Sequence, residues 1–234
     1  MRKEGDFLVA IARLEGLNKN FNGLRAVVDV TMSLEKGSVI GLVGPNGAGK
    51  TTLFNLISGF LSPTTGSIYF EGREITDWPV AKRVEAGITR TFQGSRVFSG
   101  LSVRENVTTG TYSTRKKKTT NKGRSREREP TINRILEVTK LGQYEDFLAR
   151  NLSYGYKRRL ELAIAIATDP KLLLLDEPFS GTNTFDLQEL KGLIRTLSQE
   201  GLTVVLVEHD LGSVASLADG LVYMDGGRVT IPNG

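Results

Sequence analysis

The sequence predicts an α/β fold with a mainly parallel sheet, an antiparallel β layer and an inserted helical subdomain. Short apolar runs at 39–43, 172–175 and 203–207, each bounded by turn or polar residues, are typical of buried parallel strands. Between the last two runs, residues 184–199 have apolar side chains at helical spacing, and Gly201 follows as the expected cap. This succession of strand, helix and strand indicates an α/β core.

The remaining segments divide into a second β layer and a helical part. Residues 8–14, 27–34 and 67–70 are expected to form strands of the antiparallel layer, and 221–231 a terminal hairpin. The stretch from about 94 to 168 lacks sheet-like runs and is predicted to be mainly helical. We therefore expect one domain over 1–234, in which 1–93 and 169–234 form the core and 94–168 form a helical subdomain.

The bulk composition restricts the class of protein. The 234 residues, 39% hydrophobic and 24% charged, suit one globular domain with a sizeable core. No apolar run approaches the roughly 18 residues of a membrane helix, and the charged N-terminus does not resemble a secretory signal. The sequence has no cysteine and only one histidine, which excludes a disulfide framework and a thiolate metal site. The absence of cysteine fits a reducing, cytosolic setting. If the protein acts at a membrane, it must do so through partner subunits.

The net charge of +5 is concentrated in one short polar segment. Its basic residues are Arg115, Lys116, Lys117, Lys118, Lys122, Arg124, Arg126 and Arg128. No aromatic side chains interleave with these charges as a nucleic-acid stacking platform would require. The segment is therefore interpreted as a solvated, mobile insertion, and no nucleic-acid partner is expected.

A glycine-rich loop directly after the first predicted parallel strand fits the phosphate-binding pattern G-x-x-x-x-G-K-[ST]. Its glycines let backbone N–H groups converge on phosphates, and the N-terminus of the helix expected over 50–58 adds its positive dipole. Lys50 should reach the β- and γ-phosphates, and the Thr51 hydroxyl should hold Mg²⁺. The loop consists of Gly44, Pro45, Asn46, Gly47, Ala48, Gly49, Lys50 and Thr51.

Two other predicted strands deliver polar side chains to the same edge of the sheet, where α/β proteins bind ligands. Asp176 ends the run 172–175 and is expected to hold Mg²⁺. Glu177, one residue further, is placed to deprotonate an attacking water. His209, the only histidine, follows the run 203–207 and could contact a γ-phosphate.

Taken together, these motifs resemble the nucleotide-binding domain of the ABC ATPases, a family of P-loop NTPases, over nearly the whole chain. The resemblance implies ATP and Mg²⁺ as cofactors, with 44–52, which includes Thr52, as the Walker A motif. It also implies that Gln93 is the Q-loop residue at the metal and the attacking water, that His209 is the switch histidine, and that Phe21 stacks on adenine.

The signature segment 152–156 departs from the general family pattern LSGGQ. Ser153 and Gly155 remain, and the resemblance implies that they, with Tyr156, touch the nucleotide of an opposite subunit. Ser153 could also be the N-cap of the following helix, and the two roles can coexist. After the Walker B strand, Asn183 stands where the pattern has Asp; it can hydrogen-bond across a dimer interface but carries no charge.

The subgroup that the sequence most resembles is the ATPases of branched-chain amino-acid importers, and related importers of urea or short amides share much of the pattern. The residues that support this are 91–93, 96–98, 101–106, 151–155 and 158–161. The resemblance implies an ATP-hydrolysing subunit, peripheral on the cytoplasmic face of the cell membrane. Its partners would be a second ABC ATPase subunit, identical or related, and transmembrane permease subunits.

ABC proteins with other roles are the alternatives to a transport motor. Repair and chromosome ATPases carry long coiled-coil or zinc insertions, and translation factors carry two ABC domains in tandem; neither feature occurs here. Single-domain ATPases of cluster assembly stay open as the alternative. A P-loop enzyme of another family, such as a kinase, would not explain the signature segment or His209.

Overall fold

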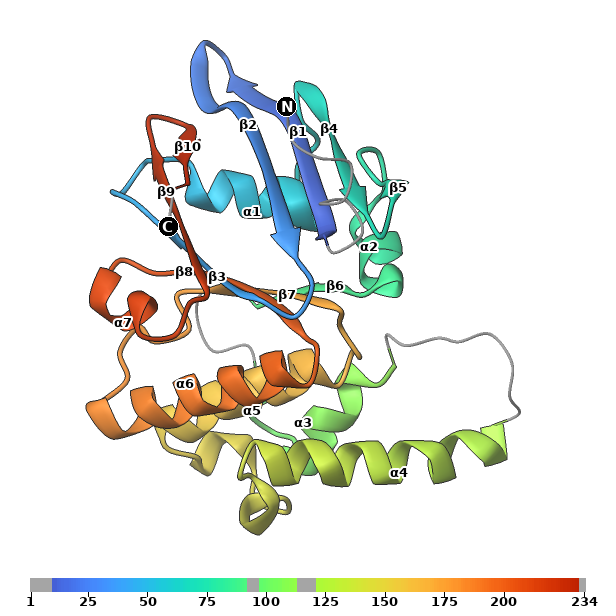
Figure 1. Ribbon diagram of the computed structural model, residues 1–234. Coiled ribbons are helices and arrows are strands. Elements are labelled where there is room, and N and C mark those ends of the chain that lie inside the picture. Colours follow the sequence, from blue (N-terminus) through green and yellow to red (C-terminus); the bar gives the residue numbers. More distant parts are fainter. Residues whose placement is uncertain (1–9, 92–96, 113–120, 232–234) are drawn as a thin grey trace.

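The computed structural model describes residues 10–91, 97–112 and 121–231, and over 121–128 it describes the backbone alone. Two sheets lie one above the other with a helix between them, and further helices cover the opposite face of the larger sheet (Figure 1). The predicted α/β class is confirmed.

The larger sheet has six strands in the order β10-β9-β3-β8-β7-β6, parallel except for β10. The three predicted parallel strands are neighbours at its centre, as β3, β8 and β7. Strand β6 was not predicted, because three residues are too few to show a periodicity. The strands are β3 Val39–Val43, β6 Ile88–Arg90, β7 Leu172–Asp176, β8 Thr203–Val207, β9 Gly220–Asp225 and β10 Arg228–Thr230.

The smaller sheet is antiparallel and has the order β2-β1-β4-β5. Its strands are β1 Ala10–Phe21, β2 Leu24–Glu35, β4 Thr65–Phe70 and β5 Arg73–Glu74. Strand β1 continues seven residues beyond the predicted end at Leu14, because its polar half remains paired with β2 as far as Phe21 opposite Leu24. Cross-strand hydrogen bonding therefore extends this strand where the apolar alternation has stopped.

Helix α1, Lys50–Ser58, is buried between the two sheets (Figure 1). Phe54, Leu56 and Ile57 pack in one core cluster with residues of β1, β3 and β7. The helix ends at Gly59, whose φ of 84° is the left-handed conformation that glycine adopts most readily. These bounds match the prediction from sequence.

The carboxyl end of α1 is held by an arginine that the sequence did not reveal. Arg83, in helix α2 (Val80–Ala86), is 1% exposed. Its Nη1 donates to the carbonyls of Leu56 at 2.6 Å and Ile57 at 2.8 Å. A cation at this end of a helix satisfies carbonyls that lack helical partners and complements the helix dipole. Arg83 therefore anchors the helix that follows the phosphate loop.

Helices α5 (Tyr154–Ile166), α6 (Thr184–Gln199) and α7 (Leu211–Ala215) cover the opposite face of the larger sheet. Successive residues of β7 point alternately into the two cores: Leu172 and Leu174 pack toward α1, while Leu173 and Leu175 pack toward the covering helices. Burial on both faces is the reason that this strand is continuously apolar.

A third core forms where α5 packs against α3 (Val103–Gly110) and α4 (Asn121–Val138). Helix α5 contributes to this core and to the one beneath the sheet, so it joins the helical part to the rest. Residues 113–120 lie outside the described chain, but 121–128 belong to α4, so this half of the predicted insertion is helical. The apolar face near Ile132 and Leu136 anchors the helix, and its backbone continues into the charged residues.

Among the described residues, no helix has the length and apolarity needed to cross a bilayer.

Candidate functional site

The phosphate loop lies between β3 and α1 and is held in place by its glycines. A Cβ at Gly44 would come within 1.9 Å of the carbonyl oxygen of Met224 in β9, and one at Gly49 within 2.2 Å of the carbonyl oxygen of Ala26 in β2. Their φ angles of 152° and 107° also favour glycine. These two glycines are therefore required for packing against both sheets, in addition to any approach to phosphate.

The outer rim of the loop is open. Pro45, Asn46 and Gly47 are exposed, and a Cβ at Gly47 would have no neighbour within 4 Å. Thr51 is exposed and Thr52 half-buried in the first turn of α1, while Ala48 is buried beneath the loop. The predicted phosphate-binding groups thus include an accessible rim at a helix N-terminus, where anions bind readily.

Lys50 is buried at the start of α1, and its Nζ donates to the carbonyls of Gly44 at 2.6 Å and Pro45 at 2.9 Å. Burial lowers the pKa of the Lys50 ammonium, and the charges of Glu177 and Asp176 oppose that shift. The two acidic residues at the end of β7 therefore lie close enough to act on the lysine of the phosphate loop, as the sequence predicts for strand ends at one edge.

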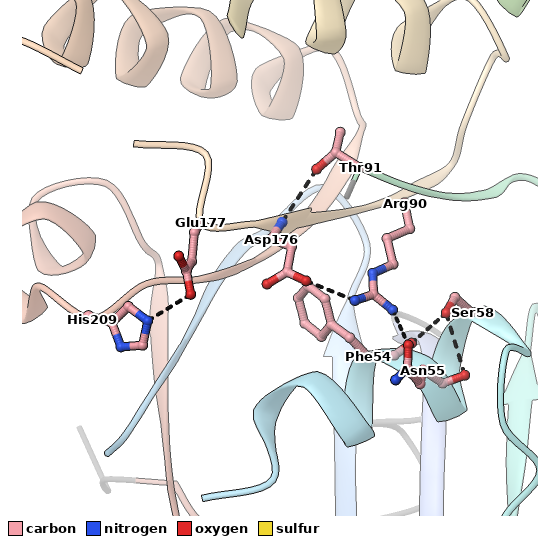
Figure 2. Close-up of polar contacts among 8 residues, drawn as sticks. All are labelled: Phe54, Asn55, Ser58, Arg90, Thr91, Asp176, Glu177 and His209. Atoms are coloured by element: carbon pink, nitrogen blue, oxygen red, sulfur yellow. Dashed lines mark hydrogen bonds and ion pairs between the residues drawn. The ribbon is translucent and has the colours of Figure 1, made fainter. Parts of the chain in front are cut away.

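Asp176 is the last residue of β7 and is 5% exposed. Figure 2 shows its carboxylate facing Arg90, with Oδ2 2.8 Å from Nη2 of that arginine. Its backbone N–H points to the hydroxyl of Thr91 at 3.3 Å. Sequence reasoning missed Arg90, since its position is recognisable only once β6 is seen to lie beside β7.

Glu177 and His209 meet across the ends of β7 and β8 (Figure 2). Glu177 Oε1 lies 2.7 Å from His209 Nε2, and the Glu177 backbone N–H donates to the carbonyl of Val207 at 3.0 Å. Glu177 has a φ of 50°, a conformation that costs a non-glycine residue about 1–3 kcal/mol and is often found at functional sites. The structure thus brings the predicted base and the predicted switch histidine together.

Glu208, between β8 and His209, was not singled out from the sequence. It is 5% exposed and accepts a hydrogen bond from the backbone N–H of Phe179 at 2.7 Å. Burial raises the pKa of the Glu208 carboxyl, and the charge of Glu177 adds to that shift. Its carboxylate ties the loop after β7 to the loop after β8, next to the contact between Glu177 and His209.

The signature segment begins helix α5, with Ser153 as the N-cap whose side chain accepts from the Tyr156 N–H. Ser153 is exposed, so its predicted contact with an opposite subunit remains sterically open. Gly155 is buried, and a Cβ there would come within 2.2 Å of the Asp186 carboxylate, so a larger residue would clash. Tyr154 uses its hydroxyl to donate to the Ser180 carbonyl at 2.9 Å, which links the signature to the loop after β7.

Two residues predicted to act across a subunit interface have partners within the chain. The Tyr156 ring lies 4.5 Å from that of Tyr144 and 5.0 Å from the guanidinium carbon of Arg159, so its side chain packs into the helical part. Asn183 caps α6 by accepting from the Asp186 N–H at 2.9 Å. Phe21 is 39% exposed at the end of β1. Gln93 lies outside the described residues.

Residues 27–180 match the family model described as ABC transporter. The chain belongs to this family. Among curated relatives, the high-affinity branched-chain amino acid transport ATP-binding protein BraF of Pseudomonas aeruginosa is 37% identical over 93% of this chain and 89% of its own length. The corresponding protein LivG of Escherichia coli is 35% identical, over 92% of this chain and 88% of its own length.

A solved structure of an ABC transporter cassette in its ADP conformation superimposes with a TM-score of 0.85, at 31% identity, over 96% of this chain and 91% of the other. The resemblance inferred from the motifs is thereby confirmed. As an ABC transporter ATPase subunit, the chain binds nucleotide and hydrolyses ATP. The alternative of a P-loop kinase is wrong.

Proposed function

We propose that this ABC ATPase powers the import of a small solute, such as a branched-chain amino acid, through membrane partner subunits. The solute class is supported by BraF and LivG, the branched-chain amino acid transport proteins that are 37% and 35% identical to this chain. The observation that carries the motor role is the contact of 2.7 Å between Glu177 and His209, beside the end of β7. Such a pair can hold a base in place for an attacking water.

The proposed cofactors are ATP and Mg²⁺. The Thr51 hydroxyl and the Asp176 carboxylate are oxygen ligands of the kind that Mg²⁺ prefers, and we propose Gln93 as a further ligand. The described residues contain no group of three or more His, Cys, Asp or Glu that could hold a metal ion. A Mg²⁺ ion bound with few protein ligands and with nucleotide phosphates fits this arrangement. When bound, it would offset the charge that develops on the phosphate oxygens.

Each residue of the site then has one role. Lys50 presents its ammonium to the β- and γ-phosphates, and the rim of the phosphate loop presents backbone N–H groups. Glu177 takes a proton from the attacking water through its carboxylate, whose orientation His209 fixes. Phe21 stacks on the adenine ring.

The functional unit is proposed to be a pair of ATPase subunits, this chain with itself or with a relative. Ser153 and Gly155 would contact the nucleotide of the partner, so that ATP becomes part of the interface. Residues 1–93 and 169–234 would act as the nucleotide-binding core. The helical residues 94–168 would pass the movement to permease subunits, with the chain peripheral on the cytoplasmic face of the membrane.

Affinity purification from native membranes, with identification of the co-purifying subunits, tests this proposal. We expect integral membrane permeases, and reconstitution with them should give ATP-dependent uptake of labelled leucine. The matched control is the Glu177→Gln complex, which should assemble but not transport. Purification with cluster-assembly proteins and no permease would contradict the proposal, and uptake of urea in place of leucine would correct the solute.

A further inference from the structure

A buried arginine joins the Walker B strand to the helix that follows the phosphate loop. The Nη2 of Arg90 donates to Asp176 Oδ2 at 2.8 Å, and its Nη1 donates to Asn55 Oδ1 at 2.5 Å (Figure 2). Its guanidinium carbon lies 5.6 Å from the centre of the Phe54 ring. The side chains of Arg90 and Asp176 are each 5% exposed, so this ion pair is almost completely removed from water.

Two of the three connected segments carry proposed Mg²⁺ ligands. Asp176 ends β7, Arg90 ends β6, and Asn55 lies one turn after Thr51 in α1. Thr51 and Asp176 are the proposed Mg²⁺ ligands. The Arg90 guanidinium therefore connects the carboxylate of Asp176 to helix α1, which carries Thr51.

Arg90 also determines which carboxylate oxygen is engaged. Its hydrogen bond is to Oδ2, which fixes the plane of the carboxylate that would hold the metal. A planar guanidinium holds its two acceptors in fixed directions, whereas a lysine ammonium at the same place is a point charge without a preferred plane. Burying an ion pair is weak evidence for stability, because desolvation offsets much of the attraction. A role in positioning accounts for its place beside the nucleotide loop.

We propose that Arg90 is a positioning residue for the Mg²⁺ site, which orients the Asp176 carboxylate and sets its place relative to Thr51. This inference rests on the proposed use of Mg²⁺. Loss of a group that hydrogen-bonds to a metal ligand and orients it typically lowers metal affinity about ten- to a hundredfold. In this role Arg90 acts through its hydrogen bonds to Asp176 and Asn55.

The test is calorimetric titration of the full chain with AMP-PNP, a non-hydrolysable ATP analogue, once in excess Mg²⁺ and once in EDTA. Arg90→Lys keeps the charge and removes the fork. We expect it to lower the affinity for the Mg²⁺ complex about tenfold and to change the metal-free affinity less than about twofold. Asn55→Ala, which removes the hydrogen bond from Arg90 Nη1, should cause a smaller loss of affinity for the Mg²⁺ complex. Arg13→Lys, at a half-exposed arginine in β1, is the matched control and should change neither affinity.

Each result decides between positioning and a purely structural role. Equal losses with and without Mg²⁺, or no loss in the Arg90→Lys variant, would overturn the inference. If Arg90→Lys does not fold, as judged by circular dichroism, Asn55→Ala decides, and an unchanged Mg²⁺-dependent affinity in that variant overturns it. A wild-type chain whose affinity does not depend on Mg²⁺ would instead overturn the proposed metal site itself.

Discussion

Glu177 Oε1 and His209 Nε2 lie 2.7 Å apart, although the two residues follow different strands and are separated by 32 positions in the sequence. Strands β7 and β8 are parallel neighbours, with Asp176 paired to Val207, so the residues that follow them emerge side by side. The histidine therefore restrains the carboxylate that is proposed to act as the base.

Replacing Glu177 by Gln should retain ATP binding, because the amide is nearly isosteric, and should lower hydrolysis about a hundredfold or more. The variant should accumulate as an ATP-bound dimer, which gel filtration with MgATP can detect. Adding Ser153→Arg should block the interface and return the monomer. Wild-type hydrolysis in the Glu177→Gln variant would show that the base is assigned wrongly.

Lys50→Ala should weaken MgATP binding roughly ten- to a hundredfold, because it removes a charge-assisted contact worth about 1.5–3 kcal/mol. Calorimetric titration measures this directly. Lys36→Ala, at an exposed lysine after β2, serves as the matched control. Unchanged affinity in the Lys50 variant would refute the assignment of the phosphate loop.

Tyr154→Phe should destabilise the fold by about 1 kcal/mol, because the variant loses the hydrogen bond to the Ser180 carbonyl while keeping the ring. The same hydroxyl accepts from Arg158 Nε at 3.1 Å. Urea unfolding gives the difference, and Tyr69→Phe in β4 controls for the loss of a hydroxyl elsewhere. Equal stability of the Tyr154 variant and the wild type would mean that the link between α5 and the loop after β7 adds nothing.

Glu208→Gln should change how stability depends on pH. Burial raises the folded-state pKa of Glu208 above its ordinary value of 4.5. Between these two pKa values, the carboxyl is protonated in the folded chain and ionised in the unfolded chain. Stability due to this group therefore falls with rising pH until the folded-state pKa is passed. The variant should lack this decline, which urea unfolding between about pH 4.5 and pH 7 would reveal.

Glu189→Gln provides a control of opposite sign for the Glu208 experiment. The hydrogen bond from Lys140 lowers the pKa of Glu189, so this group contributes stability above its unfolded pKa and loses it as pH falls through the folded value. The Glu189 variant should therefore lose stability at neutral pH relative to the wild type. The same pH slope in the Glu208 variant and the wild type would contradict the burial argument.

The sequence alone determined the elements whose periodicity and end signals are local. The buried strands 39–43, 172–175 and 203–207 and the helices 50–58 and 184–199 were predicted because apolar runs, helical spacing and glycine caps are written in consecutive residues. The phosphate loop and the acidic pair at the end of β7 were found for the same reason, since each motif is contiguous.

Tertiary structure decided the features that depend on residues far apart in the chain. Arg90 ends a strand of three residues, and its importance comes from Asp176, 86 positions later, and from Asn55 in another layer. Gly44 and Gly49 are required because a Cβ would clash with the carbonyl oxygens of Met224 and Ala26, and no local sequence pattern predicts these neighbours. The partners that Tyr156 and Asn183 have within the chain, Tyr144 and the Asp186 N–H, likewise could not be read from their motifs. Motifs specify which groups are present, but the register of neighbouring strands and the packing of helices determine what each group contacts.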